Sequence, residues 1–312
     1  MEEGIFCMEK MEQLFGAINT HVEQLEKEQE LSYLEGVLHT LDSALEQQVT
    51  LPLANVDKED IRKAIQIAML KGMRKSAQPN HQMTPDTLGF LVGYFIQQFY
   101  KDQTITVLDP AVGTGNLLFT VMNMREGIQA TGVEVDELLI QLAAVTAECL
   151  EHPIQLYRQD ALDKLLIDPV DAIICDLPVG YYPNEEVALE YELCASEGMS
   201  YAHHLFIEQS LQHVKDGGYV FLLIPATLFE SEQAKQLHSY LKKHAHIQAV
   251  VQLPTNMFAS QAHEKSLLIL QKQGEETKAP KEVLLAKVPN LQNKQALTKF
   301  FAQVQQWQDE QK

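Results

Sequence analysis

Short apolar runs alternate with helical stretches over residues 79 to 271, and this alternation limits the fold more than any other feature of the chain. The first four runs are short and apolar, as expected for parallel strands covered on both faces. The pattern therefore predicts a doubly wound α/β sheet, in which the last two runs form an antiparallel hairpin at the edge. The strand-like runs are 104–109, 130–135, 154–157, 172–175, 219–225, 247–253 and 266–271, and helices are expected at 116–124, 137–150, 201–214 and 231–244.

Residues 1–78 differ from this pattern, because they contain helical spacing and no strand-like run. Leu14, Ile18 and Val22 recur every four residues, which indicates one buried helix face. We expect an N-terminal helical domain over 1–78, serving docking or homodimerisation without chemistry of its own. The second domain, 79–312, ends in a strand-like run at 283–288 and a packing helix at 294–308.

The charge and composition exclude several classes of protein. A net charge of −19 argues against tight nucleic-acid binding by this chain alone, and favours a partner subunit, a protein substrate or a small molecule. No apolar run reaches membrane-spanning length and no secretory signal is visible, so we expect a cytoplasmic protein that does not enter a membrane. Four scattered cysteines predict free thiols and no metal site: Cys7, Cys149, Cys175 and Cys194.

A glycine turn follows the first strand-like run and opens the next helix. Gly113 and Gly115 allow the backbone to approach a ligand closely, while the start of the helix offers free N–H groups. A Walker loop is excluded because no GKS or GKT follows, and a dinucleotide fingerprint is excluded because Leu118 occupies the third glycine position. An adenosyl ligand without a pyrophosphate remains, and S-adenosylmethionine (SAM) fits.

Acidic residues follow each of the first three predicted strands. Asp109 is placed to meet the ammonium group of SAM, and an acidic residue about 20 positions past the turn can accept the ribose hydroxyls. Glu134 is the first choice for that role and Asp136 the alternative. Asp160 can bond the adenine amino group, with Ala161 against the ring.

These motifs resemble those of the N6-adenine DNA methyltransferases, in particular the modification subunits of type I restriction systems. The resemblance covers about 79–271 and implies the seven-stranded, Rossmann-like class I methyltransferase fold. The segment Asp109–Asn116 resembles the family's cofactor motif, and 81–87 resembles an upstream segment that helps close the SAM pocket. Residues 201–206, 217–218 and 253–258 resemble later family segments. The predicted cofactor residues are Thr84, Asp109, Pro110, Ala111, Gly113, Thr114, Gly115, Asn116, Glu134, Asp136, Asp160, Ala161 and Asp176.

The segment Asp176-Leu177-Pro178-Val179 matches the family's catalytic tetrapeptide, with two changes. The resemblance implies that Asp176 and the Leu177 carbonyl accept bonds from the adenine amino group and orient its nitrogen toward the SAM methyl. Leu177 replaces the first proline of the motif, Pro178 is retained, and Val179 replaces the aromatic residue that stacks on a flipped base. Tyr181 or Tyr182 can supply a ring instead.

Three hypotheses follow from these residues. The first is an N-methyltransferase of the adenine-modifying type that acts on DNA or RNA. The second is a SAM-dependent methyltransferase with a protein or small-molecule acceptor, and the third is a catalytically degenerate interaction protein that still binds SAM. His203 and His204 are expected in the core or at the surface, with lining of the acceptor pocket as the alternative. No target-recognition domain is visible, so sequence specificity has to come from a partner or from residues 1–78.

Overall fold

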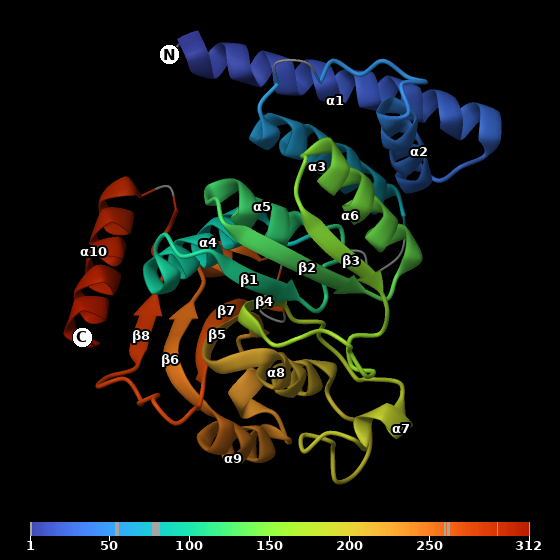
Figure 1. The fold of residues 1–312 in the computed structure, drawn as a ribbon. Helices are drawn as coiled ribbons and strands as arrows, with labels where there is room; N and C mark the ends of the chain where they lie inside the picture. Colours follow the sequence, from blue (N-terminus) through green and yellow to red (C-terminus); the bar gives the residue numbers. More distant parts are fainter. Residues whose placement is uncertain are drawn as a thin grey trace. The chain divides into compact units, whose positions relative to one another are not determined.

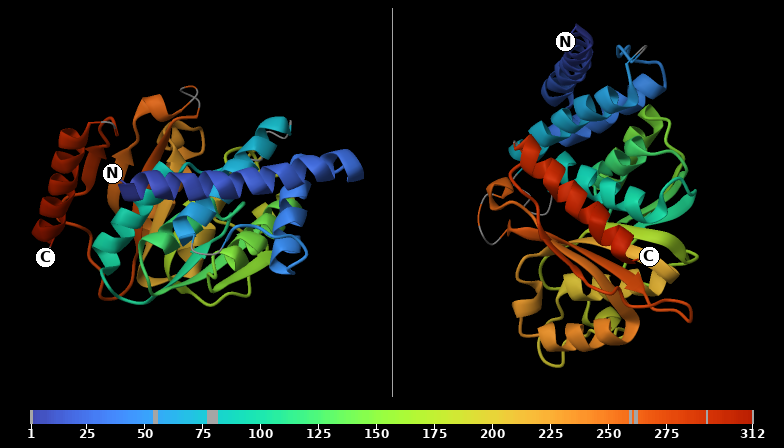
Figure 2. Two further views of the ribbon diagram at one scale, coloured as in Figure 1. Left: turned by 90° about the horizontal axis from the view of Figure 1, so that it is seen from above. Right: turned by 90° about the vertical axis from the view of Figure 1, so that its left-hand side faces the viewer.

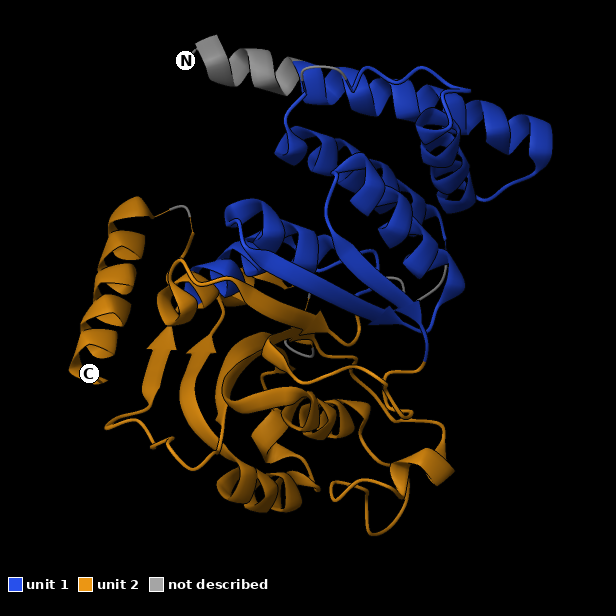
Figure 3. Cartoon of the chain, viewed as in Figure 1, with its two compact units in different colours: residues 1–95, 112–159 blue, residues 96–111, 160–312 orange. Residues whose placement is uncertain are grey.

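The computed structural model describes residues 2–53, 56–76, 82–258, 260, 263–291 and 293–311, with only the backbone of residues 2–9. The chain forms two compact units (Figure 3): Met1–Phe95 with Val112–Gln159, and Ile96–Ala111 with Asp160–Lys312. The predicted domain boundary at residue 78, like His81 and the Cys7 side chain, lies outside the described residues. The division at residue 78 therefore stays a prediction.

The first unit combines the N-terminal helices with the strands β2 and β3 and the helices α5 and α6 (Figure 1). Helix α1 contacts α2 and α3, α2 contacts α6, and α3 contacts both α5 and α6. Figure 2 shows α1 from two further sides as one continuous helix. The elements of this unit are α1 (Glu2–Gln29), α2 (Tyr33–Leu45), α3 (Lys58–Lys75), most of α4 (Asp86–Tyr100), α5 (Asn116–Met124), β2 (Ile128–Glu134), α6 (Glu137–Cys149) and β3 (Ile154–Arg158).

Local sequence signals account for these N-terminal helices. The predicted stripe on α1 is confirmed, because Leu14, Ile18 and Val22 are all fully buried. Helix α2 begins with a capping box, in which the Ser32 hydroxyl accepts from the backbone of Glu35 and the Glu35 carboxylate accepts from the backbone of Ser32. Asp57 caps α3 by a single side-chain bond, in which its carboxylate accepts from the backbone N–H of Asp60.

The second unit holds the larger part of the sheet. β1, β4 and β5 pair in parallel, whereas β7 is antiparallel to both β5 and β6, and β8 is parallel to β6. Its elements are the end of α4, β1 (Ile105–Asp109), β4 (Val170–Asp176), α7 (Glu185–Ala188), α8 (Ala202–His213), β5 (Val214–Pro225), α9 (Ala234–His244), β6 (Ala245–Gln252), β7 (Lys265–Lys272), β8 (Leu284–Lys287) and α10 (Lys294–Gln311).

The doubly wound α/β class is confirmed, with two corrections to the predicted sheet. Among the described residues the strand order is β3-β2-β1-β4-β5-β7-β6-β8, which is eight strands and not seven. β6 and β7 are antiparallel as predicted, but they do not form the edge, because β8 pairs with β6 through Ala249 and Leu284. The strand-like run at 283–288 thus joins the sheet as its last strand.

Helix α4 and the short helix α7 are elements that the periodicity did not predict. Of these, α4 is the longer one. It begins at Asp86, directly after Pro85, and its apolar residues are spread around the helix. In the second unit, the indole N–H of Trp307 on α10 donates to the Glu282 carbonyl at 2.8 Å, and its ring lies 6.3 Å from that of Phe99. None of the described helices has the length and apolar content needed to cross a membrane.

Candidate functional site

The glycine turn, residues 112–115 of the first unit, has a left-handed backbone at both glycines. Gly113 has φ +54° and Gly115 has φ +84°. A Cβ placed on Gly115 would lie 2.2 Å from the Phe119 ring, so the turn and the first helical turn of α5 pack tightly. A Cβ on Gly113 would meet no atom within 4 Å, so open space borders the turn there. This arrangement fits the backbone approach of a ligand.

Glu134, at the end of β2, is bonded directly to the glycine turn. One carboxylate oxygen accepts from the Gly113 N–H at 2.9 Å, and the other accepts from the N–H groups of Val135 and Asp136, each at 2.9 Å. The side chain is half-buried. Because three backbone donors hold the carboxylate, its orientation is set before any ligand arrives.

Asp136, the alternative to Glu134, has a different structural task. One of its carboxylate oxygens accepts from Leu138 and Leu139 at 2.9 and 3.0 Å, which caps the start of α6. An Asp in this position stabilises a helix by satisfying its first N–H groups. The two predicted ribose ligands are therefore distinguished by their partners.

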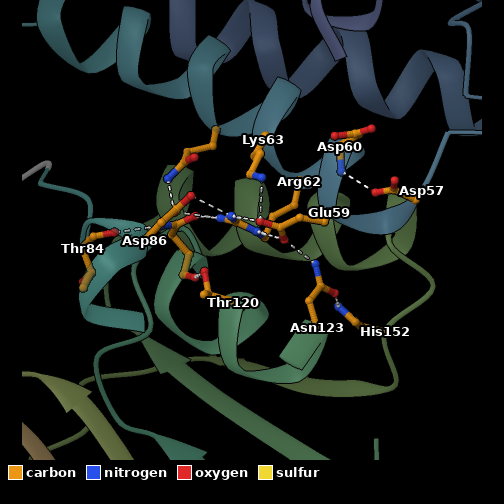
Figure 4. Close-up of polar contacts among 12 residues, drawn as sticks. Asp57, Glu59, Asp60, Arg62, Lys63, Thr84, Asp86, Thr120, Asn123 and His152 are labelled. Atoms are coloured by element: carbon orange, nitrogen blue, oxygen red, sulfur yellow. Dashed lines mark hydrogen bonds and ion pairs between the residues drawn. The ribbon is translucent and has the colours of Figure 1, made fainter. Parts of the chain in front are cut away.

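Asn116, the first residue of α5, connects the end of the glycine turn to the upstream segment of the first unit. Its amide nitrogen donates to the Thr84 carbonyl at 2.7 Å and to the Asp86 carboxylate at 3.0 Å. Its amide oxygen accepts from Arg62 at 2.7 Å. Asn116 thus contacts both Thr84 and Arg62 of α3. Figure 4 shows Arg62 near Asp86 and Thr84.

The Arg62 guanidinium is buried with two carboxylates and was not predicted to belong to a site. It donates to Glu59 and Asp86 at 2.7–2.9 Å. Burial alone would lower the pKa of Arg62, but the hydrogen bonds to Glu59 and Asp86 outweigh it and raise the pKa. Burial likewise would raise the pKa of Asp86, yet its bonds to Arg62 and Asn116 lower it. The spacing Arg62–Ile65–Met69 was a usable signal, because it places this charge on the buried stripe of α3.

In the second unit, Asp109 ends β1 and Asp160 follows β3. Asp109 is buried and accepts from the Ala111 N–H at 3.1 Å, and Pro110 is buried beside it. Asp160 accepts from the Leu162 N–H at 2.9 Å and from the Tyr182 hydroxyl at 2.7 Å. Burial, followed by the bond to Asp160, raises the pKa of Tyr182. The Tyr182 hydroxyl is therefore already used in a hydrogen bond to Asp160.

Asp176, at the end of β4, forms an ion pair with Lys265 on β7. The Asp176 and Lys265 side chains are only 17% and 21% exposed, so solvent screens this pair weakly. The next residue, Leu177, is buried, and its N–H donates to the Leu223 carbonyl at 3.2 Å. Nothing in the local sequence pointed to Lys265, which lies 89 positions away along the chain.

The end of the tetrapeptide and the segment after it are exposed at two positions. Val179, the last residue of the tetrapeptide, is 60% exposed, and the aromatic ring of Tyr181 is 58% exposed. The Tyr181 ring stacks on Tyr201, with centroids 5.0 Å apart and planes within 14°, and Tyr201 stacks in turn on His203 at 5.0 Å. His203 and His204 are both buried, so of the expected core and surface positions they occupy the core. Of the two tyrosines considered as the replacement ring, Tyr181 is the accessible one.

The parallel β1-β4-β5 core, the antiparallel β7 and the glycine turn after β1 define a class I SAM-dependent methyltransferase. A family model described as N-6 DNA Methylase matches residues 80–308. The chain therefore belongs to the N-6 DNA methylase family, and it is a SAM-dependent N-methyltransferase.

Individual proteins share the sequence or the fold of this chain. The uncharacterized protein YtxK of Bacillus subtilis (strain 168) is 47% identical over 254 residues, which cover 80% of this chain and 77% of YtxK. A Listeria monocytogenes protein assigned to the class I SAM-dependent methyltransferases has a TM-score of 0.89 and 40% identity, covering 96% of this chain and 99% of that one. The methyltransferase subunit of a type I restriction-modification system from Streptococcus thermophilus shares the fold, with a TM-score of 0.65, 15% identity, and coverage of 88% and 63%.

Proposed function

We propose that this protein transfers a methyl group from SAM to the exocyclic amino nitrogen of adenine in a nucleic acid. The observation that carries the proposal is the exposed Tyr181 ring stacked on Tyr201, in the segment directly after Asp176. An exposed ring in this segment provides the planar surface that a flipped base needs, in place of the one lost at Val179.

The cofactor supplies an electrophilic methyl group on a sulfonium, and we assign its binding to the residues of the family motifs. The open space at Gly113 is proposed to admit the amino-acid moiety, and the pre-oriented Glu134 carboxylate to accept the ribose hydroxyls. Asp109 is proposed for the ammonium group, and Asp160 and Ala161 for the adenine. Thr84, Pro110, Ala111, Thr114, Gly115, Asn116 and Asp176 complete the proposed set, and Asp136 is kept as a helix cap.

For the acceptor, Asp176 and the Leu177 carbonyl are the proposed hydrogen-bond acceptors. They would hold the amino group so that its nitrogen lone pair faces the methyl group, with Pro178 stiffening the turn. No acid or base with a perturbed pKa is required, because orientation in a closed pocket can supply most of the rate. Transfer is then a direct in-line displacement.

We further propose that a partner delivers the nucleic acid. The net charge is −19, and no Lys or Arg occurs between residues 165 and 214, the segment that contains the whole proposed acceptor site. Neutralisation of phosphates by this segment is therefore excluded. The Streptococcus relative is, by name, one subunit of a larger system. The N-terminal helices are the proposed docking or homodimerisation surface.

The same charge distribution favours a second candidate, a protein or small-molecule acceptor. Val179 in place of an aromatic residue and the Lys265 partner of Asp176 both support it.

One experiment separates these candidates. The full chain, with tritiated SAM, is incubated with duplex DNA, single-stranded DNA, RNA and cell extract, and the label is followed into each fraction. Label in adenine supports the proposal, and label confined to protein or to small molecules selects the second candidate. SAM binding by calorimetry without label in any fraction, with the extract supplying any partner, contradicts both candidates.

A further inference from the structure

Arg62 is among the largest fully buried side chains of the described residues, although it comes from the N-terminal helical region. Its guanidinium makes five hydrogen bonds of 2.7–2.9 Å, to Glu59, Asp86 and Asn116. A buried guanidinium is tolerated only when such partners replace water. Figure 4 shows Arg62 between Glu59 and Asp86, with Lys63 contacting Glu59 from the same helix.

The contact to Asn116 is the informative one. Asn116 follows Gly115, and its side chain is 54 positions from Arg62 in the sequence but only 2.7 Å away in the fold. Both its amide oxygen and its amide nitrogen are occupied by Arg62, Thr84 and Asp86. Its side chain is thus used to hold α5 in place. Because α5 begins at Asn116, the same bonds set the end of the glycine turn.

We propose that Arg62 is a positioning residue for the cofactor: through Asn116 it fixes the glycine turn, so that helix α3 sets the affinity for SAM. The proposal rests on the placement of SAM at this turn, as argued above. The planar guanidinium of Arg62 donates hydrogen bonds to Asp86 and Asn116 at the same time. A lysine ammonium cannot reproduce this geometry. By linkage, SAM binding also stabilises α3, so a partner docked on the N-terminal helices can change cofactor affinity.

The test compares full-length variants of α3 by calorimetry with SAM and with S-adenosylhomocysteine, alongside thermal unfolding. Arg62→Lys and Arg62→Met are expected to weaken binding at least about tenfold while keeping a native circular dichroism spectrum. Lys71→Met is the matched control, because Lys71 lies on the same helix and pairs with Glu23 of α1 at 2.8 Å, away from the turn. It is expected to lower the melting temperature and leave affinity close to wild type.

Folded Arg62 variants that bind SAM as tightly as the wild type would overturn the proposal. If neither variant folds, hydrogen exchange of the wild type decides: SAM is expected to slow exchange around residues 59–65 more than around 71–75, and no difference would refute the role. The Gly113→Val variant distinguishes an error in the placement of SAM from an error in the role of Arg62. Wild-type affinity in that variant would refute the placement of SAM at the turn, whereas a defect there with unaffected Arg62 variants would refute only the positioning role.

Discussion

The ammonium group of Lys265 on β7 donates to the Asp176 carboxylate at the end of β4, and a second lysine pair lies at the other end of the same strand. There Lys215 contacts Asp171 at 2.7 Å, but Lys215 is 50% exposed, against 21% for Lys265. The two pairs therefore share a strand and a chemistry but differ in burial. This difference allows the ion pair at the proposed acceptor site to be tested against a matched control.

Lys265→Met is expected to destabilise the protein by about 1–3 kcal/mol, because it leaves a largely buried carboxylate without its cation. Lys215→Met should cost less than about 1 kcal/mol, since solvent screens the exposed pair. Urea unfolding of both variants measures the difference. Equal losses would show that burial of the Asp176 pair contributes nothing.

Glu134 and Asp136 can be separated by their different partners. Glu134→Ala is expected to lower SAM affinity at least about tenfold, because charge-assisted hydrogen bonds contribute about 1.5–3 kcal/mol each. Asp136→Ala removes a helix cap, so it should cost about 1 kcal/mol of stability and leave affinity nearly intact. Calorimetry and urea unfolding give both quantities, and the reverse pattern would select Asp136 as the ribose ligand.

The two glycines of the turn should respond differently to substitution. In Gly113→Val the new side chain enters open space, so the fold is expected to be retained. The left-handed backbone should cost about 1–2 kcal/mol of stability, and SAM binding should be lost. Gly115→Ala meets the Phe119 ring and adds overpacking of about 1–3 kcal/mol to the strain. Calorimetry and thermal unfolding check both. A Gly113→Val protein with normal SAM affinity contradicts the assignment.

Tyr181→Ala is expected to reduce transfer to nucleic acid by the equivalent of about 1–3 kcal/mol, the contribution of one base–aromatic stack, without changing SAM affinity. Tyr181→Phe keeps the ring and should remain active. Leu285→Ala serves as a control, because Leu285 is 77% exposed on the edge strand β8. Values of kcat/KM from the labelling assay decide, and full activity of Tyr181→Ala would remove the stacking role.

His204 predicts how stability depends on pH. The side chain is fully buried, neither ring nitrogen has a hydrogen-bond partner among the described residues, and burial lowers its pKa from 6.5 to about 4. Between these values the unfolded chain binds the proton and the folded chain does not. Stability should therefore be complete above about pH 6.5 and fall by up to about 3 kcal/mol toward pH 4.

The matching variant is His204→Phe, which should be nearly neutral at pH 7.5, because no hydrogen bond is lost. In this variant the urea concentration at the unfolding midpoint should decrease less as the pH falls below 6.5. The decrease that remains is due to His203, because burial also lowers the pKa of His203 to about 4. An unchanged slope would mean that His204 does not titrate as described.

Much of the fold could be predicted because its signals are local. Helix α5 occupies 116–124 as predicted, since the glycine turn marks its start and the apolar run marks its length. Glu134 and Asp136 were both visible as acidic residues at the end of β2. Choosing between them was not possible, because the choice depends on which backbone N–H groups each carboxylate meets, at Gly113 or at Leu138.

The sequence by itself determined the class of fold, the glycine turn and the family resemblance of the Asp176 segment, because each depends on residues within a few positions of one another. Only the tertiary structure decided that β7 lies between β5 and β6, that Lys265 neutralises Asp176 and that Arg62 reaches Asn116. The two side-chain contacts join residues 54 and 89 positions apart. Such pairings arise when the buried faces of several elements pack together, and no local periodicity records which charges then meet.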